Sequence, residues 1–362
     1  MVSTLEVFCF QIFQMGILMQ STLNNPAKRP LLKVLPILFC LAPDCFAEAG
    51  VFSSPTNIFA PASTPANSIF GLSLFVLAIT ATIFMIVVSL LTYAAVKFRK
   101  RTDDDGREPA QVYGSNQVEI AWTVIPVLIV VVLFMATARV IASVQRTVPA
   151  NALQVVVVGH QFWWEYRYPG LKVVTANELH VPVGSPTALK LLSADTDHSF
   201  WVPRLAGKTD LIPNLTNGTW IDPQETGLYL GQCAQYCGTQ HAKMLLRVYV
   251  QSPNDFERWI QEQSQPAHLS AAVSEGRRIF EATACMNCHT VAGTPADGRF
   301  GPDLTHLMSR DTIGAGVATN NHENLRLWIQ DPSAFKPGAL MPAMGLNDRE
   351  LNAVTAYLET LR

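Results

Sequence analysis

Four side chains that bind soft metal ions lie within the stretch Cys233-Ala-Gln-Tyr-Cys-Gly-Thr-Gln-His-Ala-Lys-Met244. They are two thiols, an imidazole and a thioether, and sulfur together with imidazole is a typical ligand set for copper. A single blue-copper ion needs only one Cys, two His and a weak axial Met, so the second Cys indicates two copper ions bridged by a pair of thiolates. The second His must come from another part of the chain, and Asp195-Thr-Asp-His198-Ser-Phe-Trp offers it upstream.

Two other interpretations of this loop compete with copper. Cys233 and Cys237 could form a disulfide, or both could bind a structural zinc ion together with His198 and His241. Neither alternative accounts for Met244, because zinc rarely uses a thioether ligand. The sequence therefore favours copper.

A second redox motif, Cys285-Met-Asn-Cys288-His289, lies near the C-terminus. This is the attachment pattern of c-type haem, in which two thiols add to the vinyl groups and the adjoining His binds the iron. A redox-active C-x-x-C or half of a zinc site is the alternative, but no second C-x-x-C follows in the sequence. A sixth ligand must come from a distant segment, and a Met there raises the potential. Lys336-Pro-Gly-Ala-Leu-Met341-Pro-Ala-Met344 offers two.

Composition indicates a membrane protein with several domains. At 362 residues the chain is long enough for two or three domains, and 49% of its residues are hydrophobic. Residues 51–96 contain no charge, and neither do residues 120–138. Both runs reach the roughly 20 apolar residues that a helix needs to cross a bilayer. We expect helices at about 69–96 and 119–142, and the net charge of −2 gives no case for nucleic acid.

The two helices are predicted to form a hairpin over residues 50–143. The short stretch between them, Lys97-Phe-Arg-Lys-Arg101, is basic, and the positive-inside rule places it in the cytoplasm. Everything after Ala142 then lies on the outer side. A buried helical pair in a soluble protein is the alternative, and uncharged runs of this length disfavour it.

The N-terminal residues 1–49 are predicted to be a targeting segment that is cleaved. Lys28, Arg29 and Lys33 precede the apolar run Val34-Leu-Pro-Ile-Leu-Phe-Cys-Leu-Ala42, which is too short to span a bilayer. Ala47-Glu-Ala49 then offers small residues for cleavage. The alternative is an additional membrane anchor that is retained.

Residues 150–263 are predicted to form a β-sandwich. Short β-branched or apolar runs such as Leu153-Gln-Val-Val-Val-Val alternate with Pro, Gly, Asn and Asp, and about a hundred residues of this pattern suggest two packed sheets. A capped helix from Ser252 closes the sandwich. A polar linker follows at residues 264–269, and helical patterning begins at residue 270 and continues to residue 362.

Over residues 68–251, these motifs resemble subunit II of cytochrome c oxidase. His198-Ser-Phe-Trp-Val-Pro, Leu205-Ala-Gly-Lys-Thr-Asp-Leu-Ile-Pro213 and the Cys233–Met244 stretch carry the resemblance. It implies a cupredoxin-like sandwich that holds the dinuclear copper A centre. The implied ligands are the side chains of five residues and one backbone carbonyl: His198, Cys233, Cys237, His241, Met244 and the carbonyl of Gln235.

Three positions bear on the roles that this family implies. Most members have Glu where this chain has Gln235, and the Glu carboxylate also binds magnesium beside subunit I, so we expect that site to be weakened or missing here. The family's exposed Trp, where electrons arrive from cytochrome c, corresponds to Phe162, and the neighbouring Trp163 is the candidate substitute. Glu119 matches the Glu at the start of a proton path into subunit I. Sequence alone is equally compatible with a solvated carboxylate at a helix start.

The segment from Ser270 onward resembles a small class I cytochrome c. In that family the Met that binds iron is commonly followed by Pro, as Met341 is, whereas Met344 would be a packing residue. The stretch Gly301-Pro302-Asp-Leu resembles the one whose Pro carbonyl orients the haem His. The implied haem ligands are therefore His289 and Met341, with Cys285 and Cys288 as attachment points.

Together the resemblances imply the subunit through which electrons enter a caa-type oxidase of a bacterial inner membrane. Electrons would pass from haem c to copper A and on to subunit I, where oxygen is reduced and protons are translocated. The implied partners are subunits I and III and a donor such as a cytochrome c or a quinol–cytochrome c reductase. The alternatives are the matching subunit of a nitric oxide reductase and a membrane-anchored electron carrier. Glu119 and Lys208-Thr-Asp210 disfavour the carrier, since both face subunit I in the family.

Overall fold

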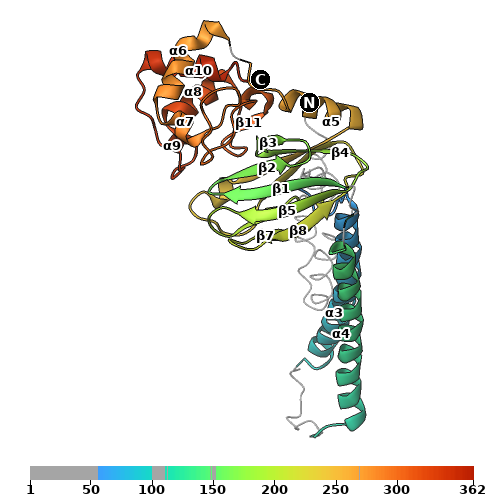
Figure 1. Ribbon diagram of the computed structural model, residues 1–362. Helices are drawn as coiled ribbons and strands as arrows, with labels where there is room; N and C mark the ends of the chain where they lie inside the picture. The colour runs from blue at the N-terminus through green and yellow to red at the C-terminus, as the bar shows by residue number, and fades with distance from the viewer. Residues whose placement is uncertain (1–55, 100–110, 112, 147, 149–151, 269) are drawn as a thin grey trace, which may run out of the picture. The chain divides into compact units, whose positions relative to one another are not determined.

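The structure is a computed structural model that describes residues 56–99, 111, 113–146, 148, 152–268 and 270–362. The predicted targeting segment at residues 1–49 and most of the basic stretch after Lys97 lie outside these residues. Figure 1 shows two long helices, a β-rich region and a helical C-terminal region in chain order. The predicted fold class is therefore confirmed.

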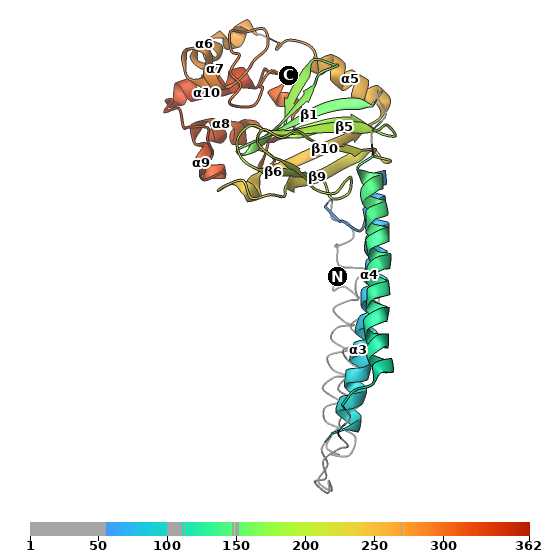
Figure 2. The same ribbon diagram turned by 60° about the horizontal axis from the view of Figure 1, so that its bottom comes forward.

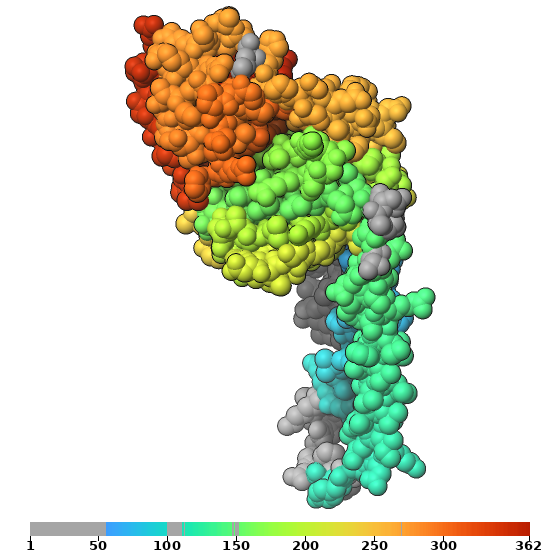
Figure 3. All heavy atoms as spheres, viewed as in Figure 1, coloured from blue at the N-terminus to red at the C-terminus, as the bar shows by residue number. Residues whose placement is uncertain are grey.

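Two helices, α3 (Thr64–Lys97) and α4 (Asn116–Val144), contact each other and are long and apolar enough to cross a membrane. The side chains of α4 are exposed along its length (Figure 3), as a lipid-facing helix requires. Both helices extend beyond the expected 69–96 and 119–142. At the start of α3, Pro65 occupies the first turn, where its missing N–H leaves no bond unmade.

The outer ends of both helices are hydrogen-bonded to the β-rich region. Trp220 Nε1 donates to the carbonyl of Val144, the last residue of α4, at 2.7 Å. At the other helix, Thr64 donates to the Asp222 carboxylate from its amide (2.7 Å) and its hydroxyl (2.6 Å). These bonds fix where the chain enters α3 and where it leaves α4.

The β-rich region consists of two five-stranded sheets, in the orders β3-β2-β1-β5-β8 and β4-β10-β9-β6-β7 (Figure 2). β1 pairs parallel with β5, β10 pairs parallel with β4, and the remaining pairs are antiparallel. The strands are β1 (Leu153–His160), β2 (Trp163–Tyr168), β3 (Val173–Ala176), β4 (Glu178–Pro182), β5 (Thr187–Ser193), β6 (His198–Trp201), β7 (Thr209–Leu211), β8 (Asn217–Ile221), β9 (Gly227–Cys233) and β10 (Leu245–Gln251).

The core of the sandwich follows the period of two that a half-buried strand requires. In β10 the alternate residues Leu246, Val248 and Val250 are buried. The largest fully buried side chains include Trp164 and Tyr166 of β2. The aromatic side chains that follow Trp163 in β2, which are Trp164, Tyr166 and Tyr168, therefore belong to the core.

Helix α5 (Pro253–Gln263) closes one end of the sandwich and buries His180. Ser252 caps the helix by accepting the Asp255 amide at 3.2 Å. The His180 ring stacks between the Trp259 ring of α5, at 4.2 Å between centroids, and the Tyr249 ring, at 4.8 Å. Burial in this stack lowers the pKa of His180 from 6.5 to about 4.

The depressed pKa of His180 predicts that acid destabilises the sandwich. The unfolded chain takes up this proton near pH 6.5 and the folded chain only near pH 4, so stability is lost as pH falls between these values. The shift corresponds to about 3 kcal/mol. The variant His180→Phe keeps a ring in the stack and should lose less stability on acidification. Calorimetry of the full chain in detergent at pH 7.5 and pH 4.5 checks this, and equal losses in both proteins would contradict it.

The C-terminal region packs five short helices around its own apolar core. The core includes Phe280, Leu325 and Tyr357, and the last helix begins with a capping box made by Asn347 and Glu350. The elements are α6 (Ser274–Ala282), α7 (Cys285–Cys288), β11 (Thr312–Ile313), β12 (Ala318–Thr319), α8 (His322–Gln330), α9 (Pro332–Phe335) and α10 (Asp348–Leu358). Short 3-10 turns complete the described part at His241–Lys243, Ala271–Val273 and Leu307–Ser309.

Candidate metal and haem sites

Two neighbouring strands position the predicted copper ligands. Cys233 is the last residue of β9, and Met244 immediately precedes β10, the antiparallel partner of β9. The Cys233 amide donates to the Met244 carbonyl at 2.9 Å, so the loop that carries Cys237 and His241 is closed at its base. On the other side of β9, β6 begins at His198 and pairs with β9 near Cys233.

The structure brings all six predicted ligand groups to one place, at which the His198, Cys233, Cys237 and Met244 side chains are buried and His241 is half-buried. The Cys237 Sγ atom lies 3.9 Å from Cys233 Sγ, 3.7 Å from His241 Nδ1 and 3.8 Å from Met244 Sδ. The Cys233 Sγ atom lies 4.0 Å from His198 Nδ1. The carbonyl oxygen of the sixth residue, Gln235, is 3.1 Å from Cys233 Sγ.

These distances bear on the alternatives to copper. Both thiols are free, and the 3.9 Å between their sulfurs is far beyond a disulfide bond of about 2.05 Å. The Met244 thioether is fully buried and faces the thiol of Cys237, where a zinc site would have no use for it. The donor set of two thiols, two imidazoles, a thioether and a carbonyl fits copper.

A carboxylate that the sequence did not single out orients the first imidazole. Asp195 Oδ1 lies 2.7 Å from His198 Nε2, which leaves Nδ1 facing Cys233. Burial disfavours the charged ring, but the bonds to Asp195 and Cys233 outweigh it and raise the pKa of His198. Such outer carboxylates fix the tautomer and orientation of ligand histidines. The only sequence signal was a carboxylate three residues before the His.

The two thiols differ in the direction in which their pKa values are shifted. A hydrogen bond from Cys237 holds the pKa of Cys233 well below its usual range, and the same bond raises the pKa of Cys237. The thiolate is the form that binds metal. Gln161, a second residue missed by sequence reasoning, lies in the turn after β1 and donates from Nε2 to the Cys237 carbonyl, which supports the loop.

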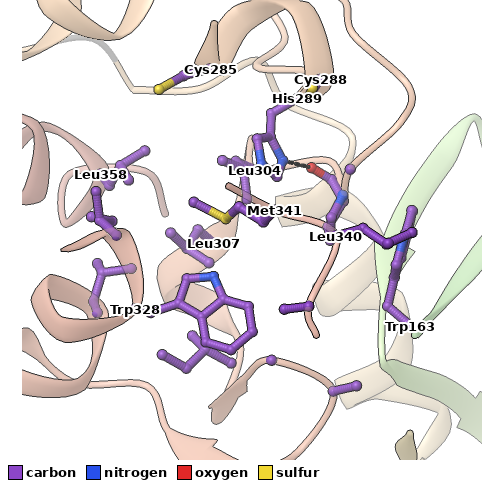
Figure 4. Close-up of a pocket in the computed structure, with 18 of the residues that line it drawn as sticks. Trp163, Cys285, Cys288, His289, Leu304, Leu307, Trp328, Leu340, Met341 and Leu358 are labelled. Carbon is purple, nitrogen blue, oxygen red and sulfur yellow. Dashed lines mark hydrogen bonds between the residues drawn. The ribbon is translucent and has the colours of Figure 1, made fainter. Parts of the chain in front are cut away.

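The C-x-x-C-H motif lies on a largely apolar cavity of 410 Å³ in the C-terminal region. His289 Nδ1 donates to the Pro302 carbonyl at 2.7 Å, shown as a dashed line in Figure 4, which leaves Nε2 as the free nitrogen. A Cβ at Gly301 would lie 2.5 Å from His289 Cε1, so only glycine lets this loop approach the ring. Burial lowers the pKa of His289 and favours the neutral ring that binds iron.

Both candidate methionines line this cavity, together with Cys285 and Cys288. In Figure 4, Met341 projects into the cavity in the neighbourhood of His289. The remaining lining is mainly aliphatic and aromatic, which suits the body of a haem. The chain thus offers a thiol pair, an imidazole and a thioether around one apolar space.

The two aromatic residues predicted to accept electrons both lie at the cavity of the C-x-x-C-H motif, and Phe162 also lies against the copper loop. Phe162 and Trp163 are 7% and 9% exposed, and both line the cavity that holds His289. The Phe162 ring also lies against Gly238 of the copper loop, where an added Cβ would be 3.1 Å from it. Trp163 stacks on His160 at 4.2 Å between centroids. Glu119 lies apart from both sites, exposed in the first turn of α4.

Three family descriptions match successive parts of the chain. They are the transmembrane domain of cytochrome c oxidase subunit II over residues 53–140, its periplasmic domain over residues 171–251, and cytochrome c over residues 273–362. Cytochrome c oxidase subunit 2 of Alkalihalophilus pseudofirmus is 34% identical over 299 residues, which cover 78% of this chain and 86% of that protein. This chain belongs to the cytochrome c oxidase subunit II family.

Further relatives of this subunit II agree. Cytochrome c oxidase subunit 2 of Bacillus sp. strain PS3 is 33% identical over 286 residues, covering 73% of this chain and 80% of that protein. The periplasmic domain of subunit II from Bradyrhizobium japonicum is a similar solved structure, at 30% identity and a TM-score of 0.31, covering 32% of this chain and 96% of that one. The chain is a membrane-bound subunit through which electrons enter a cytochrome c oxidase complex, with copper A and haem c as its cofactors and a C-terminal cytochrome c that fits the caa-type fusion.

Proposed function

We propose that the copper A ligands of this subunit are the six groups gathered at the end of β9. They are His198, Cys233, the carbonyl of Gln235, Cys237, His241 and Met244. The observation that carries the proposal is the approach of both thiols to each other and to one imidazole each. The haem would be held by Cys285, Cys288, His289 and Met341, which line one cavity.

Each part of the chain has a separate task at these sites. When bound, the copper pair and the haem supply one-electron transfer. Asp195 keeps the Nδ1 atom of His198 directed at Cys233. In the same way, the carbonyl of Pro302 holds the Nδ1 side of the His289 ring and leaves Nε2 free to bind iron. Burial of the two thiols keeps water away from the sulfurs. The protein thus contributes orientation and a dry environment.

Metal and haem analysis of the full chain, purified in detergent, tests the proposal. We expect two copper ions and one covalently bound haem per chain, because two thiols can bridge a pair of ions. One copper ion per chain, or zinc in its place, would contradict the dinuclear site. A haem that organic solvent extracts would contradict attachment at Cys285 and Cys288.

The partners and the location follow from the hairpin and the family. We propose that α3 and α4 pack against subunit I, with subunit III also in the complex, in a bacterial inner membrane. The basic stretch after Lys97 would lie in the cytoplasm and both redox sites in the periplasm. Glu119 would open a proton path into subunit I. The donor would be a cytochrome c or a quinol–cytochrome c reductase.

The exchange of Glu for Gln235 predicts a weak or missing magnesium site beside subunit I. The Gln235 side chain is exposed, so it is free to face a partner, but its amide is a poorer ligand for Mg²⁺ than a carboxylate. Gln235→Glu should restore metal occupancy without altering the copper spectrum, because the carbonyl toward Cys233 is unchanged. Manganese EPR of the complex from cells grown in manganese measures this. A wild-type signal as strong as that of the variant would refute it.

A further inference from the structure

The segment between the sandwich and the cytochrome is bonded to the cytochrome and is not a free tether. The Ala267 amide donates to the Ala292 carbonyl at 3.1 Å, and Ala267 is buried in the cytochrome core. The carbonyl of Gln265 bonds with His306 Nε2 at 2.9 Å. Only a few residues after α5 therefore connect the two regions, which restricts how far the cytochrome can move.

A turn of the cytochrome domain packs against the β-sandwich. Gly314, Ala315 and Gly316 all have left-handed backbone angles, with φ of 62°, 62° and 83°, which bend the chain sharply between β11 and β12. Ala315 at the tip is 1% exposed and packs with Trp163 and Ala176 of the sandwich. The Leu245 amide donates to the Ala315 carbonyl at 3.2 Å.

A buried carboxylate of the sandwich accepts hydrogen bonds from the residues just before this turn. Glu178 of β4 is 2% exposed and accepts three hydrogen bonds from two residues of the cytochrome. The donors are the Asp311 amide at 3.1 Å, and the Thr312 amide and hydroxyl, both at 2.9 Å. A carboxylate has enough acceptor sites for all three bonds. Without these donors, burying the Glu178 carboxylate would destabilise the protein, so the contact between the two domains depends on them.

The cytochrome in turn buries a lysine against the sandwich. Lys336 is 3% exposed, and its Nζ donates to the Phe162 carbonyl at 2.9 Å and to the Gly314 carbonyl at 2.9 Å. One amine therefore joins three segments: the Met341 loop, the turn at Gly314, and the residue before Trp163. A buried lysine without these acceptors would destabilise the arrangement.

We propose that the cytochrome is docked on the copper domain in one fixed orientation, and that Lys336 is the positioning residue that holds the haem cavity against Trp163. The proposal rests on the proposed ligand roles. It follows that Trp163, which the docked cytochrome covers, is not open to an external donor.

Amide exchange in the full chain, loaded with copper and haem, tests the docking. Lys336→Met keeps the length of the side chain and removes the donors. We expect the amides of Leu245 and Thr312, which bond across the boundary, to exchange about tenfold faster or more. Electron transfer from haem to copper after photochemical reduction of the haem should slow only by the factor by which the docked fraction falls, because amide exchange follows the undocked fraction and electron transfer follows the docked one.

Two further variants separate docking from damage to the cofactor sites. Glu178→Gln, on the opposite side of the boundary, places an NH₂ group toward a donor amide and should give the same two effects with unchanged haem and copper spectra. Lys190→Met, at an exposed lysine of β5, should change neither. Wild-type exchange rates at Leu245 and Thr312 in Lys336→Met would overturn the proposal. A wild-type chain that lacks the copper or haem absorbance would contradict the ligand roles. The amide exchange rates would still show whether the cytochrome is docked.

Discussion

Replacing Cys233 with serine is expected to abolish the copper pair and leave the covalent haem intact. Cys233 Sγ lies near both Cys237 Sγ (3.9 Å) and His198 Nδ1 (4.0 Å), so its loss would remove one of the two thiolates that would hold the copper pair. A serine hydroxyl is a harder donor with a far higher pKa, and it does not replace a thiolate toward copper. Copper content should fall from two ions per chain to about one or none.

The readouts are metal analysis and the mixed-valence copper spectrum, measured on the full chain in detergent. The haem absorbance serves as the internal control, because Cys285 packs against a separate core from the one that contains Cys233. Met244→Leu is the matched variant, since it removes only the weak thioether and should alter the spectrum while two ions remain bound. A Cys233→Ser protein with two ions and an unchanged spectrum would refute the bridging role.

The grouping of the proposed copper ligands could be predicted from sequence because four of them are close along the chain. Spacing alone placed Cys233, Cys237, His241 and Met244 together, and the sheet added only the strand that brings His198 beside them. Membrane helices were also predictable, since composition over a long run decides them. The ends of α3 and α4 were harder to predict, because polar residues at a membrane boundary carry no hydropathy signal.

The residues that support the sites could not be predicted in the same way. Glu178 and Lys336 are single charged residues, which sequence patterns assign to a solvated surface. Their burial depends on contacts between segments far apart in the chain, such as Lys336 with Phe162. No local period or spacing encodes such a contact. The same holds for Trp163, whose place on the haem cavity depends on how the cytochrome packs.

The position of Trp163 also suggests why Phe162 stands where the family has an exposed Trp. In the family the matching Trp is exposed and receives electrons from a separate cytochrome c. Here both residues are buried beside a cavity that the same chain supplies. A chain that carries its own cytochrome has no need of an exposed aromatic for a diffusing donor. Phe162 instead contributes a carbonyl to Lys336 and a ring to the copper loop.

Met341→Ala is expected to convert the haem from low-spin to high-spin, or to a form with a different sixth ligand, while Met344→Ala leaves it low-spin. Both side chains line the same cavity as the C-x-x-C-H motif, so the pair is a matched test of which sulfur binds the iron. Loss of a thioether ligand should also lower the reduction potential, by on the order of 0.1 V or more. The haem remains attached in both variants, because Cys285 and Cys288 are unchanged.

Absorption and EPR spectra of the two full-length variants, with a potentiometric titration of each, decide between the methionines. Met341 is favoured because Pro342 follows it, which stiffens the loop at the position that must hold a ligand against His289. A high-spin Met344→Ala protein beside a low-spin Met341→Ala protein would reverse the assignment. It would also move the ligand three residues further from Lys336, so the loop that Lys336 anchors would have to reach the iron by a longer path.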